Sequence, residues 1–201
     1  YPFITPLAAK GMVGAILGIT DFTTRDYVGI QLLNPVRTSA QQLSMLGKDS
    51  GQTFNRPTTV ELLVNPAYLV YYVGDEYVDK LAESLKRRQY VNHTYLGVAY
   101  ALTYPEFRQY YEEVEIISDE EVIETSSVVP TNLIKELILQ EDRYYSRAGG
   151  FMKDYLGERR FEKSISFIYE KDGRPIKFRL KKSNDEECLV VRIGDRQICL
   201  V

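Results

Sequence analysis

Apolar residues dominate the chain between Pro2 and Ile19, and this run predicts a buried helix. Thr5 is suited to cap the helix with its hydroxyl, and Pro6 to the first helical position, where its missing N–H leaves no bond unmade. The run is shorter than the ~20 apolar residues that span a bilayer, and it carries Lys10 inside. It therefore predicts neither a membrane span nor a signal peptide.

Three glycines, Gly11, Gly14 and Gly18, lie three and four residues apart in this helix, which places them on one face. Each glycine costs roughly 1 kcal/mol relative to alanine in a helix, so another feature must need the room. Close packing of the helix on a sheet is one explanation. Close approach of a protein or RNA backbone near the helix start, where free N–H groups attract phosphate, is the other, and the two are compatible.

Shorter apolar runs of extended type predict strands at 26–34, 59–64 and 68–73. Between the first two, residues 35–58 are polar and basic, with Asp49 as their one acid. A polar connection of this length is uncommon in a compact domain and is more often functional than not. We therefore predict a long protruding hairpin, or arm, at 35–58.

Residues 75–89 have helical periodicity, with an apolar stripe that runs from Val78 to Leu85. Acidic residues lead this helix and three basic residues close it, as the helix dipole favours. The basic end, Lys86–Arg88, is explained equally well by RNA contact and by the dipole, so we do not assign it to a site.

The second half of the chain predicts mostly strands. Residues 112–124 hold seven acids and no base, and their alternating apolar positions predict a strand pair with an acidic outer face. Pro130 marks the expected boundary, a short helix is expected at 131–140, and a loop at Gly149–Gly150. Further strands, with turns at Asp-Gly and Gly-Asp pairs, are expected at 163–170, 176–180, 188–193 and 197–201.

The composition of the chain excludes some classes of binding site. A net charge of −3 over 201 residues excludes a uniformly basic nucleic-acid protein, so any basic site must be local. Two blocks qualify, the arm and residues 158–182, which hold nine bases against four acids. A single histidine excludes most multi-histidine metal sites, and we expect no metal and no cofactor.

The two cysteines, Cys188 and Cys199, lie in a predicted hairpin that turns at Gly194–Asp195. In that register Cys188 faces Val201 and Cys199 faces Val190, so the two thiols are offset. This arrangement predicts free thiols rather than a disulfide, which fits a reducing cytosol and a cytoplasmic location.

Four phrases follow one another along the chain: YPFITPLAAKGMVGAILG, NPVRTSAQQLSML, NRPTTVELLVNPAYLVYYV and HTYLGVAYAL. Their order resembles the Cas five family of type I CRISPR effector complexes (Cascade), most closely its I-B branch, over about residues 1–130. The resemblance implies an α+β chain, with a ferredoxin-like, RNA-recognition-type domain at 1–130, its thumb hairpin at 35–58, and a β-rich region at 131–201. Family members have a strand ahead of the YPF phrase, so a first strand is expected before Tyr1.

The resemblance also implies a role. Family members bind the repeat-derived 5′ handle of the CRISPR RNA and cap one end of the complex, and their thumb packs on the adjacent Cas seven backbone subunit and kinks the RNA. The expected partners are therefore the CRISPR RNA, the Cas seven subunit and the large Cascade subunit, with target DNA reached only through the complex. No membrane partner is expected.

RNA contact is expected at the glycine-rich helix, in and beside the thumb, and around the single histidine: Lys10, Gly11, Arg37, Lys48, Arg56, His93 and Tyr95. Arginine clamps phosphate with its fork of donors, although any one of these charges is also explained as a solvated surface residue. Met45 and Leu46 are apolar positions in the polar arm. They are expected to wedge against a base step or a neighbouring subunit, with a small local core as the alternative.

His93 is the candidate for an acid or base in RNA cleavage. The I-C branch of the family cuts its precursor RNA without metal, through a tyrosine, a lysine and a histidine, and Asn92 stands where that branch has the lysine. We therefore expect a non-catalytic subunit, with a metal-independent endoribonuclease as the alternative and a purely protein-binding module as a third possibility. The acids at 112–124 are not expected to hold a metal, because consecutive strand residues point to opposite faces.

Overall fold

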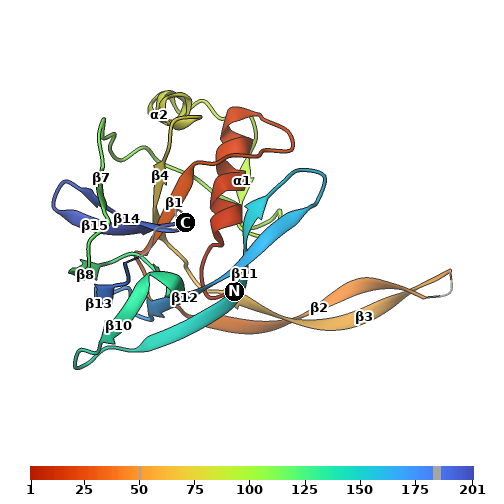
Figure 1. The fold of residues 1–201 in the computed structure, drawn as a ribbon. Coiled ribbons are helices and arrows are strands. Elements are labelled where there is room, and N and C mark those ends of the chain that lie inside the picture. Colours follow the sequence, from red (N-terminus) through yellow and green to blue (C-terminus); the bar gives the residue numbers. More distant parts are fainter. Residues whose placement is uncertain (50, 183–186) are drawn as a thin grey trace.

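The computed structural model describes residues 1–49, 51–182 and 187–201, and over these ranges the chain is a mixed α+β protein with two α-helices and many strands (Figure 1). The helices are α1 (Pro6–Leu17) and α2 (Val78–Arg87). The strands of the first half are β1 (Tyr27–Leu32), β2 (Thr38–Asp49), β3 (Gln52–Leu63), β4 (Tyr68–Val73), β5 (Thr94–Tyr95) and β6 (Leu102–Thr103). Those that follow are β7 (Glu115–Ile117), β8 (Val122–Thr125), β9 (Val129–Pro130), β10 (Ile134–Ile138), β11 (Tyr145–Tyr155), β12 (Phe161–Glu170), β13 (Ile176–Leu180), β14 (Leu189–Ile193) and β15 (Arg196–Leu200).

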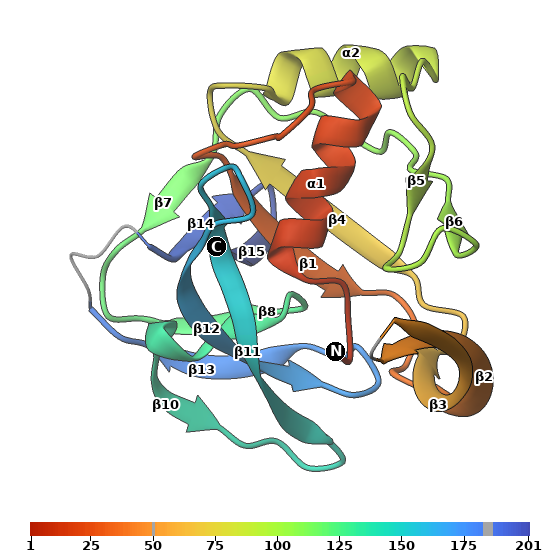
Figure 2. The ribbon, with the colours of Figure 1, turned by 90° about the vertical axis from the view of Figure 1, so that its right-hand side faces the viewer.

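Strands β1 and β4 form an antiparallel pair that lies between two layers. The two helices pack on one face, where Ile16 and Leu81 meet Tyr72, and Figure 2 shows α1 lying across the pair. The β14–β15 hairpin covers the other face and contacts Tyr71. A Cβ at Gly29 of β1 would lie 2.7 Å from the Ile198 side chain, so glycine is what permits this close approach.

Helix α1 begins as the sequence predicts, because the Thr5 hydroxyl accepts a hydrogen bond from the Ala8 N–H at 3.0 Å. The three glycines serve different purposes. Gly18 ends the helix in the left-handed conformation, at φ 71°. A Cβ on Gly14 would lie 2.5 Å from the Cβ of Phe22, so this glycine packs against a side chain and not, as expected, against a sheet, whereas Gly11 has no neighbour within 4 Å.

The predicted arm is confirmed as a long two-stranded hairpin (Figure 1). It is longer than expected, because β2 and β3 pair continuously from Thr38 opposite Leu63 to Asp49 opposite Gln52. The strand predicted at 59–64 is therefore the inner part of the arm and not a separate element. In Figure 1 the two strands project away from the rest of the molecule, and every residue of β2 is exposed or only half-buried.

Three predictions for the second half of the chain are wrong in detail. The strands within 112–124 do not pair with each other, because β7 pairs with β14 and β8 with β13. The helix expected at 131–140 is a single 3-10 turn (Thr131–Leu133) followed by strand β10. The Gly149–Gly150 pair is not a loop but lies inside β11, at the bulge where its register against β12 shifts.

The strands predicted beyond residue 160 are confirmed with small changes of boundary, and Cys199 lies opposite Val190 as expected. Both cysteines are buried, and neither is in a disulfide. The core is continuous across the expected boundary. Phe3 stacks on Phe151 with ring centroids 5.0 Å apart, and β9, which contains Pro130, pairs with β12. Residues on both sides of position 130 therefore share sheets and one main core.

The contrast between Gly11 and Gly14 gives a test of the α1 packing. We expect Gly11→Ala to stabilise the protein by roughly 0.5–1 kcal/mol, because the new methyl group enters open space in a helix. Gly14→Ala should destabilise it by about 1–3 kcal/mol, because Phe22 must move. Urea unfolding of the two variants measures both effects, and equal changes of the same sign would contradict this packing.

Candidate nucleic-acid interface

The arm presents two different faces. Residues opposite each other in an antiparallel ladder share a face, so Met45 and Arg56 lie on one side, while Leu46 and its partner Asn55 lie on the other. Met45 is 50% exposed and Leu46 is 79% exposed. The two apolar side chains therefore point in opposite directions and do not form a small local core.

The basic residues of the arm are spread along its length. Arg37 lies at the base, directly before β2, whereas Lys48 lies next to the tip, and eleven residues of extended chain place them about 36 Å apart. Arg56 lies between them on β3. All three are exposed, and none has an ion-pair partner among the residues that the structure describes. The arm thus offers a line of free cations rather than a single cluster.

The structure does not favour the expected RNA contact through the Lys10 side chain. Its side chain is only 7% exposed, and burial, together with the nearby charge of Lys153, holds the pKa of the Lys10 amine below its usual value. A group buried in this way does not offer its charge to a phosphate at the surface. The neighbouring Gly11 remains exposed.

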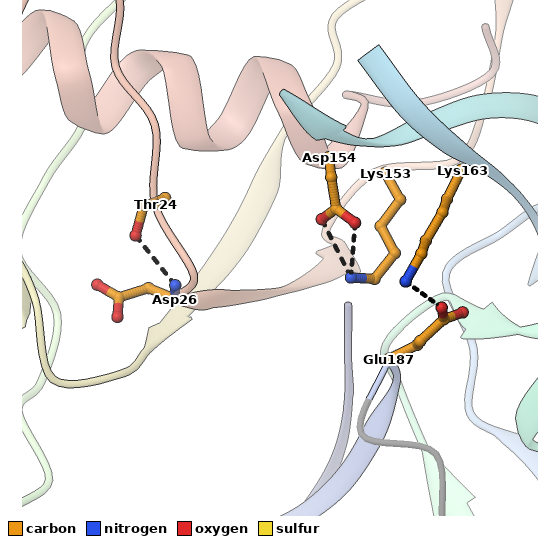
Figure 3. Close-up of polar contacts among 6 residues, drawn as sticks. All are labelled: Thr24, Asp26, Lys153, Asp154, Lys163 and Glu187. Atoms are coloured by element: carbon orange, nitrogen blue, oxygen red, sulfur yellow. Dashed lines mark hydrogen bonds and ion pairs between the residues drawn. The ribbon is translucent and has the colours of Figure 1, made fainter. Parts of the chain in front are cut away.

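The charged groups that act on Lys10 include Lys153, Asp154 and Asp26. Figure 3 shows these three residues beneath α1. Lys153, on β11, is 9% exposed and donates a hydrogen bond to the carboxylate of Asp154 at 3.1 Å. Lys163 of β12 points toward Glu187 and forms an ion pair with it. Sequence reasoning could have found the burial of Lys10, since the same helix was expected to be buried on nearly every side.

Two buried carboxylates are committed to structure. Asp26 is 3% exposed, and its carboxylate accepts hydrogen bonds from the backbone N–H groups of Asp75 at 3.1 Å and Tyr77 at 3.2 Å, just before α2. Glu170 is 1% exposed and accepts from backbone N–H groups that include that of Arg174 at 2.8 Å. Because backbone donors already occupy these oxygens, neither group is a candidate for proton transfer.

The structure brings His93 and Tyr95 together on the β5–β6 hairpin. Thr94, opposite Thr103, is buried, and its hydroxyl donates to the Thr103 carbonyl at 3.1 Å. The next pair of the ladder points to the opposite side, so Tyr95 lies opposite Leu102, and each is 51% exposed.

His93 directly precedes β5 and Tyr104 directly follows β6, and Tyr104 is 79% exposed. Sequence reasoning missed Leu102 and Tyr104. The alternation of residue types on either side of Gly97 could have predicted this hairpin. Gly97 lies in the connecting turn and takes a positive φ of 80°.

Five of the nine bases in the second basic block, residues 158–182, form ion pairs. Lys177 pairs with Glu124 at 3.9 Å, and Arg179 with Glu136 at 3.5 Å. Further pairs join the block to acids elsewhere or within it: Arg160–Glu158, Lys163–Glu187 and Arg174–Asp172. Of these pairs, only Lys177–Glu124 joins the block to the acidic segment at 112–124. The block also keeps four bases without an ion pair among the described residues: Arg159, Lys171, Lys181 and Lys182.

The basic end of α2 is engaged locally. The Lys86 ammonium lies 4.9 Å from the Phe107 ring centroid, and Arg87 pairs with Glu83 at 2.7 Å. An open cavity of about 340 Å³ lies here, lined by two acids, two bases, Ala82 and Tyr110. Its balanced charge favours no charged ligand, and the cations at this end serve the helix itself.

Within the described ranges, no group of three or more histidine, cysteine or acidic side chains is arranged to hold a metal ion. No helix of the described chain is long and apolar enough to cross a membrane. Comparison with protein-family models, with curated proteins and with solved structures finds no match. The functional argument therefore rests on the chain's own residues and geometry.

The burial of Lys10 leads to a stability prediction. Because its pKa is lowered, the folded state binds this proton less tightly than the unfolded chain, so the charged amine destabilises the fold at neutral pH. We expect Lys10→Met to stabilise the protein on the order of 1 kcal/mol at neutral pH. The gain should shrink as the pH rises toward the ordinary lysine value of 10.5.

Urea unfolding at neutral and alkaline pH measures this effect. Lys48→Met, which alters an exposed lysine of the arm, is the matched control and should leave stability nearly unchanged. A clear loss of stability in Lys10→Met would show that the Lys10 charge has a partner that the structure does not contain.

Proposed function

We propose that this chain is a non-catalytic subunit of a type I CRISPR effector complex, of the Cas five family, that binds the 5′ handle of the CRISPR RNA and caps the backbone of the complex. The observation that carries the proposal is the arm. An isolated two-stranded hairpin is at best marginally stable in water. This one is long, is not covered by other elements of the described structure, and carries exposed apolar and basic side chains. Such an element is suited to contact with partners on both of its faces.

The order of elements supports the fold part of the proposal. A helix, a strand, the arm, a strand and a second helix follow one another, and both helices pack on the same face of the β1–β4 pair. This arrangement supports a ferredoxin-like domain. We assign that domain to residues 1–130, although its core continues into the β-rich region at 131–201.

The two arm faces suit two partners. Both faces carry exposed apolar side chains and a cation: Met45, Phe54 and Arg56 lie on one face, and Leu46 and Lys48 on the other. An apolar side chain beside a cation can separate two bases while the cation holds a phosphate. We assign one face to the RNA and the other to the adjacent Cas seven subunit. Contacts with the large Cascade subunit, and a cytoplasmic location, follow from the same assignment.

The proposal gives His93 a binding role. Asn92 stands at the lysine position of the cleaving branch, and His93 is an exposed side chain beside Tyr95 at the start of an outward-facing hairpin. An exposed imidazole flanked by flat rings is suited to contact unpaired bases.

The salt dependence of RNA binding tests the arm. A synthetic RNA with the 5′ handle of the cognate repeat is titrated with the protein at several salt concentrations, and binding is followed by fluorescence anisotropy. We expect Arg37→Ala and Arg56→Ala each to weaken binding and to reduce the slope of log K against log salt by ~0.7 per lost phosphate contact. Arg179→Ala, which removes a cation already paired with Glu136, is the control and should leave the slope unchanged. Unchanged slopes in both arm variants would remove the arm from the RNA site.

Cleavage is tested on the same RNA. Incubation with the protein in EDTA, followed by a denaturing gel, should leave the RNA intact, while a native gel shows a handle-dependent shift. Specific cleavage that His93→Ala abolishes would instead identify a metal-independent endoribonuclease.

A further inference from the structure

Residues 86–111 combine aromatic and basic side chains to an unusual degree for this chain. They contain six of its 16 tyrosines, and they carry four lysines and arginines against one acid, Glu106. That acid is paired with Arg108 at 3.2 Å, within the same segment. Interleaved cations and flat rings are the combination with which proteins hold single-stranded nucleic acid.

Five of these six tyrosines fall into two groups. Tyr90 donates its hydroxyl hydrogen to the Pro105 carbonyl at 2.6 Å, and Tyr110 donates to Asp79 at 2.6 Å, so both hold the fold together. The hydroxyls of three others have no hydrogen-bond partner among the described residues: Tyr95, Tyr100 and Tyr104. These three are also the more exposed, at 51%, 67% and 79%.

The free tyrosines gather on the β5–β6 hairpin. Tyr95 lies opposite Leu102, Tyr104 directly follows the end of β6, and Tyr100 lies in the turn between the two strands. The turn is closed by two backbone hydrogen bonds, from the Leu96 N–H to the Ala101 carbonyl and from the Ala101 N–H to the Val98 carbonyl. We call Tyr95, Tyr100, Leu102 and Tyr104 the tyrosine face.

The hairpin is held firmly on its inner side. The Thr94 and Thr103 hydroxyls are hydrogen-bonded to each other at 2.7 Å, and the backbone N–H groups of Val91 and Asn92 donate to carbonyls at the end of α1. The face is therefore fixed in position before any ligand arrives, which lowers the entropy lost on binding. Such rings suit stacking on bases better than rings on a mobile loop.

We propose that the tyrosine face is a stacking platform for unpaired bases of the bound RNA. This inference rests on the proposed function and deepens it, because it names the chemistry that the site recognises: the faces of successive single-stranded bases, whatever their sequence. Figure 2 shows the hairpin beside α1, on the side of the molecule from which the arm also leaves. One RNA strand can thus meet cations on the arm and rings on the hairpin.

Single substitutions test the platform in the full chain. The wild-type protein, Tyr95→Ala, Tyr104→Ala and the corresponding Phe variants are titrated against the fluorescent handle RNA. We expect each Ala variant to bind at least about fivefold more weakly, and each Phe variant to bind as the wild type, because phenylalanine keeps the ring. The salt slope should stay constant, since no tyrosine neutralises a phosphate. Tyr144→Ala, which removes an exposed tyrosine outside this face, is the matched control.

An abasic RNA sharpens the test. When one nucleotide of the handle lacks its base, the loss caused by its tyrosine partner should disappear, because the two changes remove the same contact. Wild-type affinity in both Ala variants would overturn the platform while the RNA-binding function stands. Loss of Cas seven capture with unchanged RNA affinity would also overturn it, by making the face a protein contact. If the wild-type chain itself fails to bind the RNA, the proposed function and the platform both fall.

Discussion

The antiparallel pairing of β1 with β4 is the constraint on which the proposed interface depends. Its ladder continues through the hydrogen bond from the Leu33 N–H to the Ala67 carbonyl at 2.9 Å, and the arm ladder begins with that from the Val64 N–H to the Arg37 carbonyl, also 2.9 Å. Only a few residues separate the two ladders, so the arm leaves the body in a fixed direction. Helices on one face and β14–β15 on the other hold the pair in place.

The distribution of charge follows from what the core can accept. Burial withdraws Lys10 from the surface, and ion pairs such as Lys177–Glu124 engage five of the nine bases at 158–182. The arm cations are left unpaired within the described structure. A chain of net charge −3 can thus offer a polyanion a local basic track, and the tyrosine face adds contact that does not depend on charge.

Patterns in neighbouring residues predicted the features that depend on neighbouring residues. The cap at Thr5 and the offset of Cys199 were available from residue types and periodicity, and both are confirmed. The predictions failed for strands whose pairing partners lie far away in the sequence. β10 is a strand because β13 pairs with it, and β7 and β8 take partners far along the chain rather than each other. The same limit applied to the candidate site, because only the pairing of β5 with β6 brings Tyr104 near Tyr95.

RNA–protein crosslinking tests the central claim most directly. The handle RNA is prepared with 4-thiouridine at successive positions, irradiated on the protein, and the attached peptides are identified by mass spectrometry. The account predicts crosslinks to the β5–β6 hairpin from some positions and to the arm from others, in an order that follows the RNA strand. Crosslinks confined to residues 158–182, or absent from both the arm and the hairpin, would contradict it.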